Sequence, residues 1–291
     1  MNLIFSINGG IGKTIAATAV CAVIKKNFPK GKLIVVSGYP EVFLNNPNVH
    51  RSFAFEQTSY FYQEYVEGKE CEVFAHDPYL DNKYIQQETH LIKVWCEMFG
   101  LDYKGEQPEI FLTDREIQFN KNKYNSEKPI MLMQTNGGAE NQQLKYSWAR
   151  DIPSSVVVKI IQEFKSDYNI IHVRREDQVS FPFTTPVTDN FRSLVTLFSL
   201  SKKRLLMDSF GQHTAAALKL PSTVLWIANK PEVFGYDIHS NFVSNPFTKE
   251  PELKGSYLQK FSINGDPLQF PFNSEDEIFN VDEIIASLKK D

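Results

Sequence analysis

The sequence lacks several features that would assign a protein to a class at once. It has no run of about 18 apolar residues, which predicts that no helix spans a membrane. Its first residues lack the basic segment and small-residue cleavage site of a secretory signal. It has only three cysteines and no C-x-x-C pair, which favours a reduced, cytoplasmic protein.

The chain also lacks an excess of positive charge. Its 31 basic and 35 acidic residues give a formal net charge of −4, which argues against a protein that mainly coats nucleic acid. No D-x-D pair and no cluster of histidines and cysteines occurs, so we predict no metal site. What is present is an ordinary globular composition, with 42% hydrophobic residues over 291 positions, enough for one large domain or two.

Short apolar runs alternate with helical segments in two series. We expect strands at residues 3–7, 32–36, 70–75, 130–134, 169–173, 204–207 and 223–227. We expect helices at residues 14–26, 86–99, 154–164, 191–200, 214–220 and 281–290. Strands joined by helices form parallel sheets with right-handed crossovers, so the fold class is α/β.

A polar stretch rich in Lys and Asn, residues 113–128, separates the two series and is the best linker candidate. We therefore expect one domain over residues 1–125, a second over 126–275 and a C-terminal helix within 276–291. A cleft between two such domains is where small molecules bind.

The first strand leads into a glycine loop, residues 9–14, that reads Gly-Gly-Ile-Gly-Lys-Thr. Backbone N–H groups of such a loop can hold an anion. The usual phosphate-loop spacing fails because Ile7 stands where the first glycine belongs. The shorter form resembles deviant Walker ATPases, but Asn8 replaces their lysine and residues 35–39 lack their aspartate. An ATPase remains an alternative, as does a glycine turn that serves only close packing.

A second loop, residues 208–213, follows a buried strand and precedes an alanine-rich segment. Amide groups at such a helix start can hold a diphosphate, and Ser209 and His213 add a hydroxyl and an imidazole. The plainer interpretation is that Asp208 and Ser209 only cap the helix.

Residues 208–221 resemble the donor-site motif of the lipopolysaccharide heptosyltransferases, glycosyltransferase family 9, D-S/T-G-x-x-H-x-A-A-A-L-x-x-P. The Asp-to-His spacing matches, but Gly211 comes one position late, after Phe210. Residues 8–14, 27–35, 46–49 and 95–101 resemble the N-terminal half of that family. Residues 134–138 and 145–148 resemble its first donor-side loop, in which a lysine shortly before a tryptophan contacts phosphate.

The resemblance implies a GT-B architecture, in which two Rossmann-like domains face a central cleft with the acceptor side first. It implies an inverting transferase that needs no metal or other cofactor and takes a nucleotide-diphosphate sugar as donor. The acceptor would be a saccharide hydroxyl or a modified nucleic-acid base. The donor-binding residues it implies are Thr135, Asn136, Gly137, Lys145, Glu176, Asp208, Ser209, Gly211 and His213. Glu176 would bind the ribose, although a solvated charge run is an equal interpretation of residues 174–177.

The acceptor-side loop would be Gly9, Gly10 and Gly12, and here the chain departs from the family. Lys13 stands where the family has the aspartate that serves as general base. A protonated lysine cannot take a proton, so we expect it to bind an anion instead.

We consider Asp77, His76 and Glu41 as replacement bases and favour Asp77, which sits at the end of the strand expected at 70–75. A turn cap before Pro78 is the plainer role for Asp77. A chain that has lost catalysis and only binds a sugar nucleotide is a third hypothesis.

Overall fold

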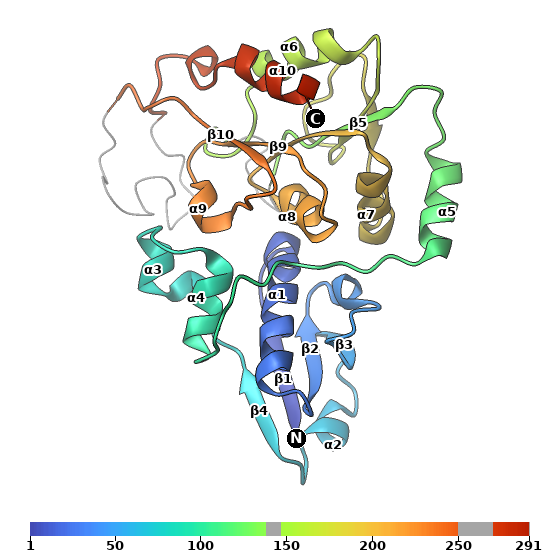
Figure 1. Cartoon of the computed structure of the whole chain (residues 1–291), viewed down its shortest axis with the longest axis vertical. Helices are drawn as coiled ribbons and strands as arrows, with labels where there is room; N and C mark the ends of the chain where they lie inside the picture. The colour runs from blue at the N-terminus through green and yellow to red at the C-terminus, as the bar shows by residue number, and fades with distance from the viewer. Residues whose placement is uncertain (138–146, 250–269, 291) are drawn as a thin grey trace.

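The computed structural model describes residues 1–137, 147–249 and 270–290, which form two α/β halves, one above the other in Figure 1. Each half is built on one sheet, and every strand pair in both sheets is parallel. The central strands are buried along nearly their whole length, because helices cover both faces of a parallel sheet. The predicted α/β class with two parallel units is confirmed.

The first half has a four-stranded sheet in the order β3-β2-β1-β4. Its strands are β1 (Asn2–Ile7), β2 (Lys32–Ser37), β3 (Arg51–Ala54) and β4 (Cys71–Phe74). Its helices are α1 (Ile11–Asn27), α2 (Phe61–Tyr65), α3 (Asn82–Ile85) and α4 (Leu91–Met98). Helix α1 is alanine-rich and buried on most sides, and its last turn carries Lys25 and Lys26, which complement the helix dipole.

The second half has a six-stranded sheet in the order β10-β9-β8-β5-β6-β7. Its strands are β5 (Ile130–Met133), β6 (Asn169–Val173), β7 (Thr185–Val187), β8 (Lys203–Met207), β9 (Thr223–Trp226) and β10 (Ser240–Val243). Its helices are α6 (Ser154–Phe164), α7 (Phe191–Leu200), α8 (Phe210–Ala217), α9 (Pro231–Phe234) and α10 (Val281–Lys290). The chain runs outward from β5 to β7 and then returns to β8 on the other side of β5. Such a reversal opens a crevice at the carboxyl ends of β5 and β8.

The two halves share apolar packing. Helix α1 of the first half lies against α8 of the second, as Figure 1 also shows. Ala216, Ala217 and Tyr236 belong to the same buried cluster as the core of the first half. Tyr84 and Leu91, from the first half, pack in turn into a cluster of the second. The carboxyl edges of the two sheets therefore meet across a packed contact.

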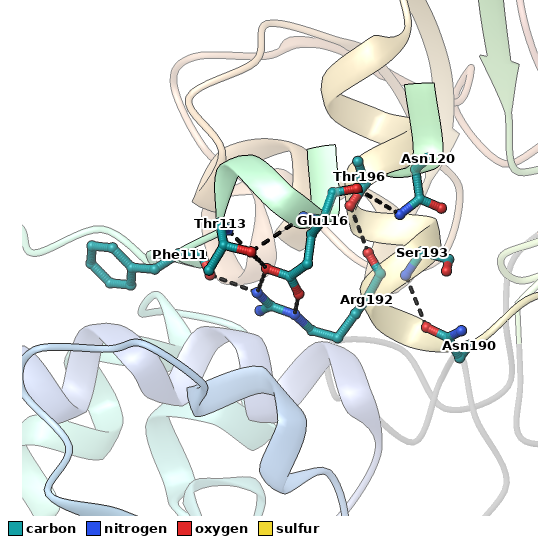
Figure 2. A network of polar contacts seen from close by, with 8 residues as sticks. All are labelled: Phe111, Thr113, Glu116, Asn120, Asn190, Arg192, Ser193 and Thr196. Carbon is teal, nitrogen blue, oxygen red and sulfur yellow. Dashed lines mark hydrogen bonds and ion pairs between the residues drawn. The ribbon is translucent and has the colours of Figure 1, made fainter. Parts of the chain in front are cut away.

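The stretch expected to be a linker contains a helix, α5 (Asp114–Lys123). Thr113 and Glu116 form a reciprocal capping box at its start. Glu116 also accepts hydrogen bonds of 2.7 and 2.9 Å from Arg192 on α7, and the same guanidinium bonds to the carbonyl of Phe111 (Figure 2). The apolar-poor composition concealed this helix, because polar contacts and capping hold it in place.

Helix α8 begins at Phe210, whereas we expected a loop as far as His213 and a helix from residue 214. Gly211 and His213 therefore lie in the first turn of the helix. Ser209, the residue before the helix, makes no side-chain cap hydrogen bond. The carboxamide of Gln134, which follows β5, instead accepts the N–H of Gly211 at 3.0 Å. This long-range cap extends the helix beyond the start that local sequence suggests.

Candidate functional site

A pocket of about 250 Å³ opens at the carboxyl ends of β5, β6, β7 and β8. Gln134, Asn136 and Gly137 line it from the loop after β5, and Ser209 and Phe210 line it from the end of β8. It thus occupies the crevice that the strand order creates, the usual ligand position in open α/β sheets. The structure brings together the loops around residues 135–137 and 208–211, which the sequence analysis assigned to one donor site.

The loop after β5 is held by buried polar contacts. The N–H of Gly137 donates to Asp151 Oδ1 at 2.9 Å, and Thr135 Oγ1 lies 2.8 Å from His172 Nε2. Burial raises the pKa of Asp151 and lowers that of His172 to about 4, so the imidazole is neutral near pH 7. Of the three residues predicted here, Asn136 and Gly137 reach the pocket wall, whereas Thr135 is buried beneath it.

The loop after β8 begins with a buried aspartate. Asp208 accepts a short hydrogen bond from the amide of Asn229, and burial raises its pKa. Ser209 is half-buried and lines the pocket. A Cβ on Gly211 would lie 2.4 Å from Gln134 Oε1, so a larger residue there would displace the Gln134 carboxamide. The glycine that comes one position late in the motif thus leaves room for Gln134, the residue that follows β5.

His213 lies between the halves, with both ring nitrogens occupied. Nδ1 is 2.8 Å from the hydroxyl of Tyr236, and Nε2 is 3.0 Å from Nε2 of Gln212. The Gln212 amide also donates to the Phe234 carbonyl, which identifies this nitrogen and makes His213 Nε2 an acceptor. Burial lowers the pKa of His213 to about 3, so the ring is neutral. Its predicted contact with a donor phosphate would require this arrangement to change.

The glycine loop of the first half faces this region. Gly9 has φ +107°, a backbone conformation that favours glycine. A Cβ on Gly12 would lie 3.0 Å from the His213 ring and 3.5 Å from the Phe210 backbone. The start of α1 therefore lies against the start of α8, next to the pocket wall.

Lys13 and Asp77, the two predicted catalytic residues, form an ion pair with 2.7 Å between Nζ and Oδ1. The lysine side chain is 2% exposed and the aspartate side chain 34%. Nζ also lies 4.5 Å from the centre of the Tyr79 ring, a cation–π contact. Burial lowers the pKa of Lys13, although the Asp77 carboxylate opposes that shift.

Asp77 also caps the short turn Pro78–Leu80, the plainer role expected from the sequence, because its Oδ1 accepts the N–H of Tyr79 at 3.0 Å. Its Oδ2 has no hydrogen-bond partner among the described residues. One carboxylate oxygen is therefore fixed by two donors, and the other remains available.

Of the predicted donor residues that the structure describes, Thr135, Glu176, Asp208, Gly211 and His213 do not line the pocket. Glu176 is exposed and does not line it, whereas Arg174 and Arg175 from the same charge run do. Lys145 lies outside the described residues. Gln134 was not predicted as a site residue, because its contacts with Ser209 and Gly211 span more than 70 positions of sequence. Arg174 and Arg175 were visible in the sequence as part of a charge run, but the spacing of that run did not indicate that they line a pocket.

Within residues 1–137, 147–249 and 270–290, no group of three or more His, Cys, Asp or Glu side chains is arranged to hold a metal ion. In the same part of the chain, no helix is both long and apolar enough to cross a bilayer.

No known protein-family model matches the sequence, and no curated protein sequence does. Solved structures do match. The family 9 glycosyltransferase of Veillonella parvula DSM 2008 superposes with a TM-score of 0.69 at 12% identity, over 99% of this chain and 96% of that one. ADP-heptose lipopolysaccharide heptosyltransferase II of E. coli gives 0.65 at 14% identity, over 86% of this chain and 92% of the other.

A third neighbour is the iron-containing dodecameric glycosyltransferase TibC of enterotoxigenic E. coli H10407. Its TM-score against this chain is 0.69 at 14% identity, and the match covers 100% of this chain and 78% of the TibC chain. These identities are low, and what the three matches have in common is the arrangement of both halves. The chain has the GT-B fold, with two parallel α/β units that meet at the carboxyl edges of their sheets.

Proposed function

We propose that the protein is a glycosyltransferase that moves a sugar from a nucleotide-diphosphate donor to an acceptor hydroxyl, with inversion and without a metal. The observation that carries the proposal is the pocket at the crossover between β5 and β8, in a chain with the fold of heptosyltransferases. Among the neighbours, TibC has been solved in complex with ADP-D-beta-D-heptose. A nucleotide sugar is the ligand class that such a pocket fits.

On the donor side, the diphosphate takes hydrogen bonds from the pocket wall. Ser209 offers a hydroxyl, Asn136 lines the wall with it, and Arg174 and Arg175 add positive charge to a wall that also contains Asp189. Lys145, outside the described residues, is a further candidate. These groups stabilise the negative charge that builds up on the leaving diphosphate, the role a metal ion has in other transferases.

On the acceptor side, Asp77 is the general base. The acceptor oxygen bonds to the anomeric carbon, the bond from that carbon to the diphosphate oxygen breaks, and Asp77 Oδ2 takes the hydroxyl proton. Lys13 holds Oδ1 in place, which makes it a positioning residue for the base. The proximity of Gly12 to Phe210 and His213 supports this assignment, because the start of α1, which carries Lys13, lies next to the pocket wall.

A ligand panel tests the proposal. Thermal unfolding is followed with UDP, GDP and ADP sugars and, separately, with ATP and Mg²⁺. Binding to the folded state raises the melting temperature. We expect a rise with at least one nucleotide sugar and slow release of its nucleoside diphosphate. A rise with ATP–Mg²⁺ alone would refute the transferase.

The ATPase alternative is disfavoured by the Lys13 contact, because the buried amine is already paired with Asp77. The same ligand panel tests the third hypothesis, an inactive sugar-nucleotide-binding protein. Such a protein would bind a nucleotide sugar without transferring the sugar or hydrolysing the donor. The acceptor is a saccharide or a nucleic-acid base, and product mass spectrometry separates the two.

A further inference from the structure

Gln134 lies at the floor of the crevice between β5 and β8 and is 3% exposed. Its carboxamide makes three hydrogen bonds. Oε1 accepts the Gly211 N–H at 3.0 Å, and Nε2 donates to the Asn136 carbonyl at 3.3 Å and to Ser209 Oγ at 3.1 Å. A single side chain thus links the loop after β5 to both the start of α8 and the serine of the donor loop.

The orientation of this carboxamide is fixed by backbone groups of known polarity. A backbone N–H can only donate and a carbonyl can only accept, so Oε1 must face Gly211 and Nε2 must face Asn136. The amide nitrogen therefore donates to Ser209, and Ser209 Oγ must be the acceptor in that bond.

The hydrogen of the Ser209 hydroxyl is not used in the bond with Gln134. A hydroxyl has one hydrogen and two lone pairs, and Gln134 occupies a lone pair of Ser209. Among the described residues, no side chain accepts the Ser209 O–H, and Ser209 lines the pocket. With respect to the described residues, the hydroxyl hydrogen is therefore free to turn toward a ligand in the pocket.

We propose that Gln134 is a positioning residue that keeps Ser209 as a hydrogen-bond donor to the diphosphate of the sugar nucleotide. The inference rests on the proposed function and adds to it a residue and a direction of hydrogen bonding. The serine keeps its proton throughout. The hydrogen bond from the Ser209 O–H to the phosphate oxygen becomes stronger as the bond between the anomeric carbon and the diphosphate oxygen breaks and its electron pair passes to the diphosphate.

The test compares a nucleoside diphosphate with its nucleoside, because only the former has the phosphates. The tightest binder among ADP, GDP and UDP is titrated by calorimetry into wild type, Ser209→Ala, Gln134→Ala and the double variant. We expect each single variant to weaken diphosphate binding about tenfold, the effect of losing one hydrogen bond to a charged group. Nucleoside binding should stay within about twofold, and the double variant should bind no more weakly than Ser209→Ala.

Gln134→Ala leaves the buried N–H of Gly211 without its partner, so a second variant guards against loss of folding. Gln134→Glu keeps an acceptor for that N–H, but its other oxygen attracts the Ser209 hydrogen away from the ligand. It should also weaken diphosphate binding relative to nucleoside binding. Gln118→Ala, on the exposed face of α5, is the matched control and should change neither affinity.

Equal weakening of nucleoside and nucleoside diphosphate in Gln134→Ala would mean that Gln134 only supports the fold, and would overturn the inference. So would fully additive losses in the double variant. If wild type binds none of the three diphosphates, the proposed function itself fails, which is a different pattern of results.

Discussion

At the scale of single residues, Lys13 and Asp77 are unequal partners in burial. The lysine side chain is 2% exposed, whereas a third of the aspartate side chain reaches solvent. Removal of the lysine leaves a carboxylate that water can hydrate. Removal of the aspartate leaves a buried ammonium group without a counter-ion, which is far more costly.

We therefore expect Asp77→Asn to destabilise the protein by about 3 kcal/mol and Lys13→Met by about 1 kcal/mol or less. The double variant should be more stable than Asp77→Asn alone, because it no longer buries a lone charge. Urea denaturation of the three variants measures this order. A double variant less stable than either single variant would contradict the argument.

The same substitution has a pH signature. Burial already lowers the pKa of Lys13 below its usual 10.5, and loss of Asp77 lowers it further. The folded state then binds fewer protons than the unfolded chain, so the stability of Asp77→Asn should rise as pH increases toward 10.5. Wild type should show a smaller rise over this range, and equal slopes would argue against a buried charge.

Catalysis gives the third test at this scale. If Asp77 is the base, Asp77→Asn lowers kcat by about 10²-fold or more while donor binding is retained. Turnover is measured below the melting temperature of the variant, with circular dichroism as the check on folding. Asp102→Asn, at an exposed ion pair with Lys104, is the matched control. Unchanged turnover in Asp77→Asn would remove it as the base.

At the scale of elements, helix α5 shows how a polar segment is fixed in place. Its outward face has little to bury, and a bidentate contact between Glu116 and Arg192 anchors it to α7 (Figure 2). That contact lowers the pKa of Glu116 to about 2, with the Arg192 hydrogen bond as the main cause. Lys123 and Tyr124, at the end of the helix, bond to Asp189, which lines the pocket. The connection between the halves is thus tied to the donor side.

Glu116→Gln should cost about 1–3 kcal/mol of stability at pH 7, since it weakens a charge-assisted pair. A carboxyl with a depressed pKa contributes stability that is complete above its ordinary value of 4.5 and is lost as pH falls toward 2. The difference between wild type and variant should therefore shrink between these two pH values. Glu163→Gln, at the exposed pair with Lys289, is the control and should cost about 0.5 kcal/mol or less. An equal cost for the two variants would mean that the α5 contact is ordinary surface pairing.

Helix α5 also illustrates the reach of sequence analysis. The central strands were predictable because both faces of a parallel sheet are covered, which leaves continuous apolar runs. The linker prediction rested on low hydrophobicity alone and did not consider Thr113 and Glu116, which form the capping box in the structure. Strands β3, β7 and β10 are short and lie toward the sheet margins, where the apolar signal is weak.

The site residues, too, were predictable from sequence where the signal is local, and not where a contact joins distant segments. Ser209 and Asn136 were predicted from local motifs, and both line the pocket. The Gln134 contacts and the Lys13–Asp77 pair join segments distant in sequence, so no local pattern contains them. These contacts follow only from the strand order, which brings the segments together.

At the scale of the whole molecule, the two halves share part of their buried cores. Two of the three buried clusters among the described residues contain side chains from both halves. Loss of either half would expose apolar surface on the other, which favours cooperative unfolding. We expect a single calorimetric transition whose calorimetric and van't Hoff enthalpies agree. Two resolved transitions would show that the halves unfold independently.

The contact between α1 and α8 also affects how the chain is made. A ribosome releases α1 long before residues 210–217 exist, so the apolar side of α1 that α8 will cover stays bare while the second half is still being synthesised. Translation pauses in that interval would prolong this exposure and invite aggregation.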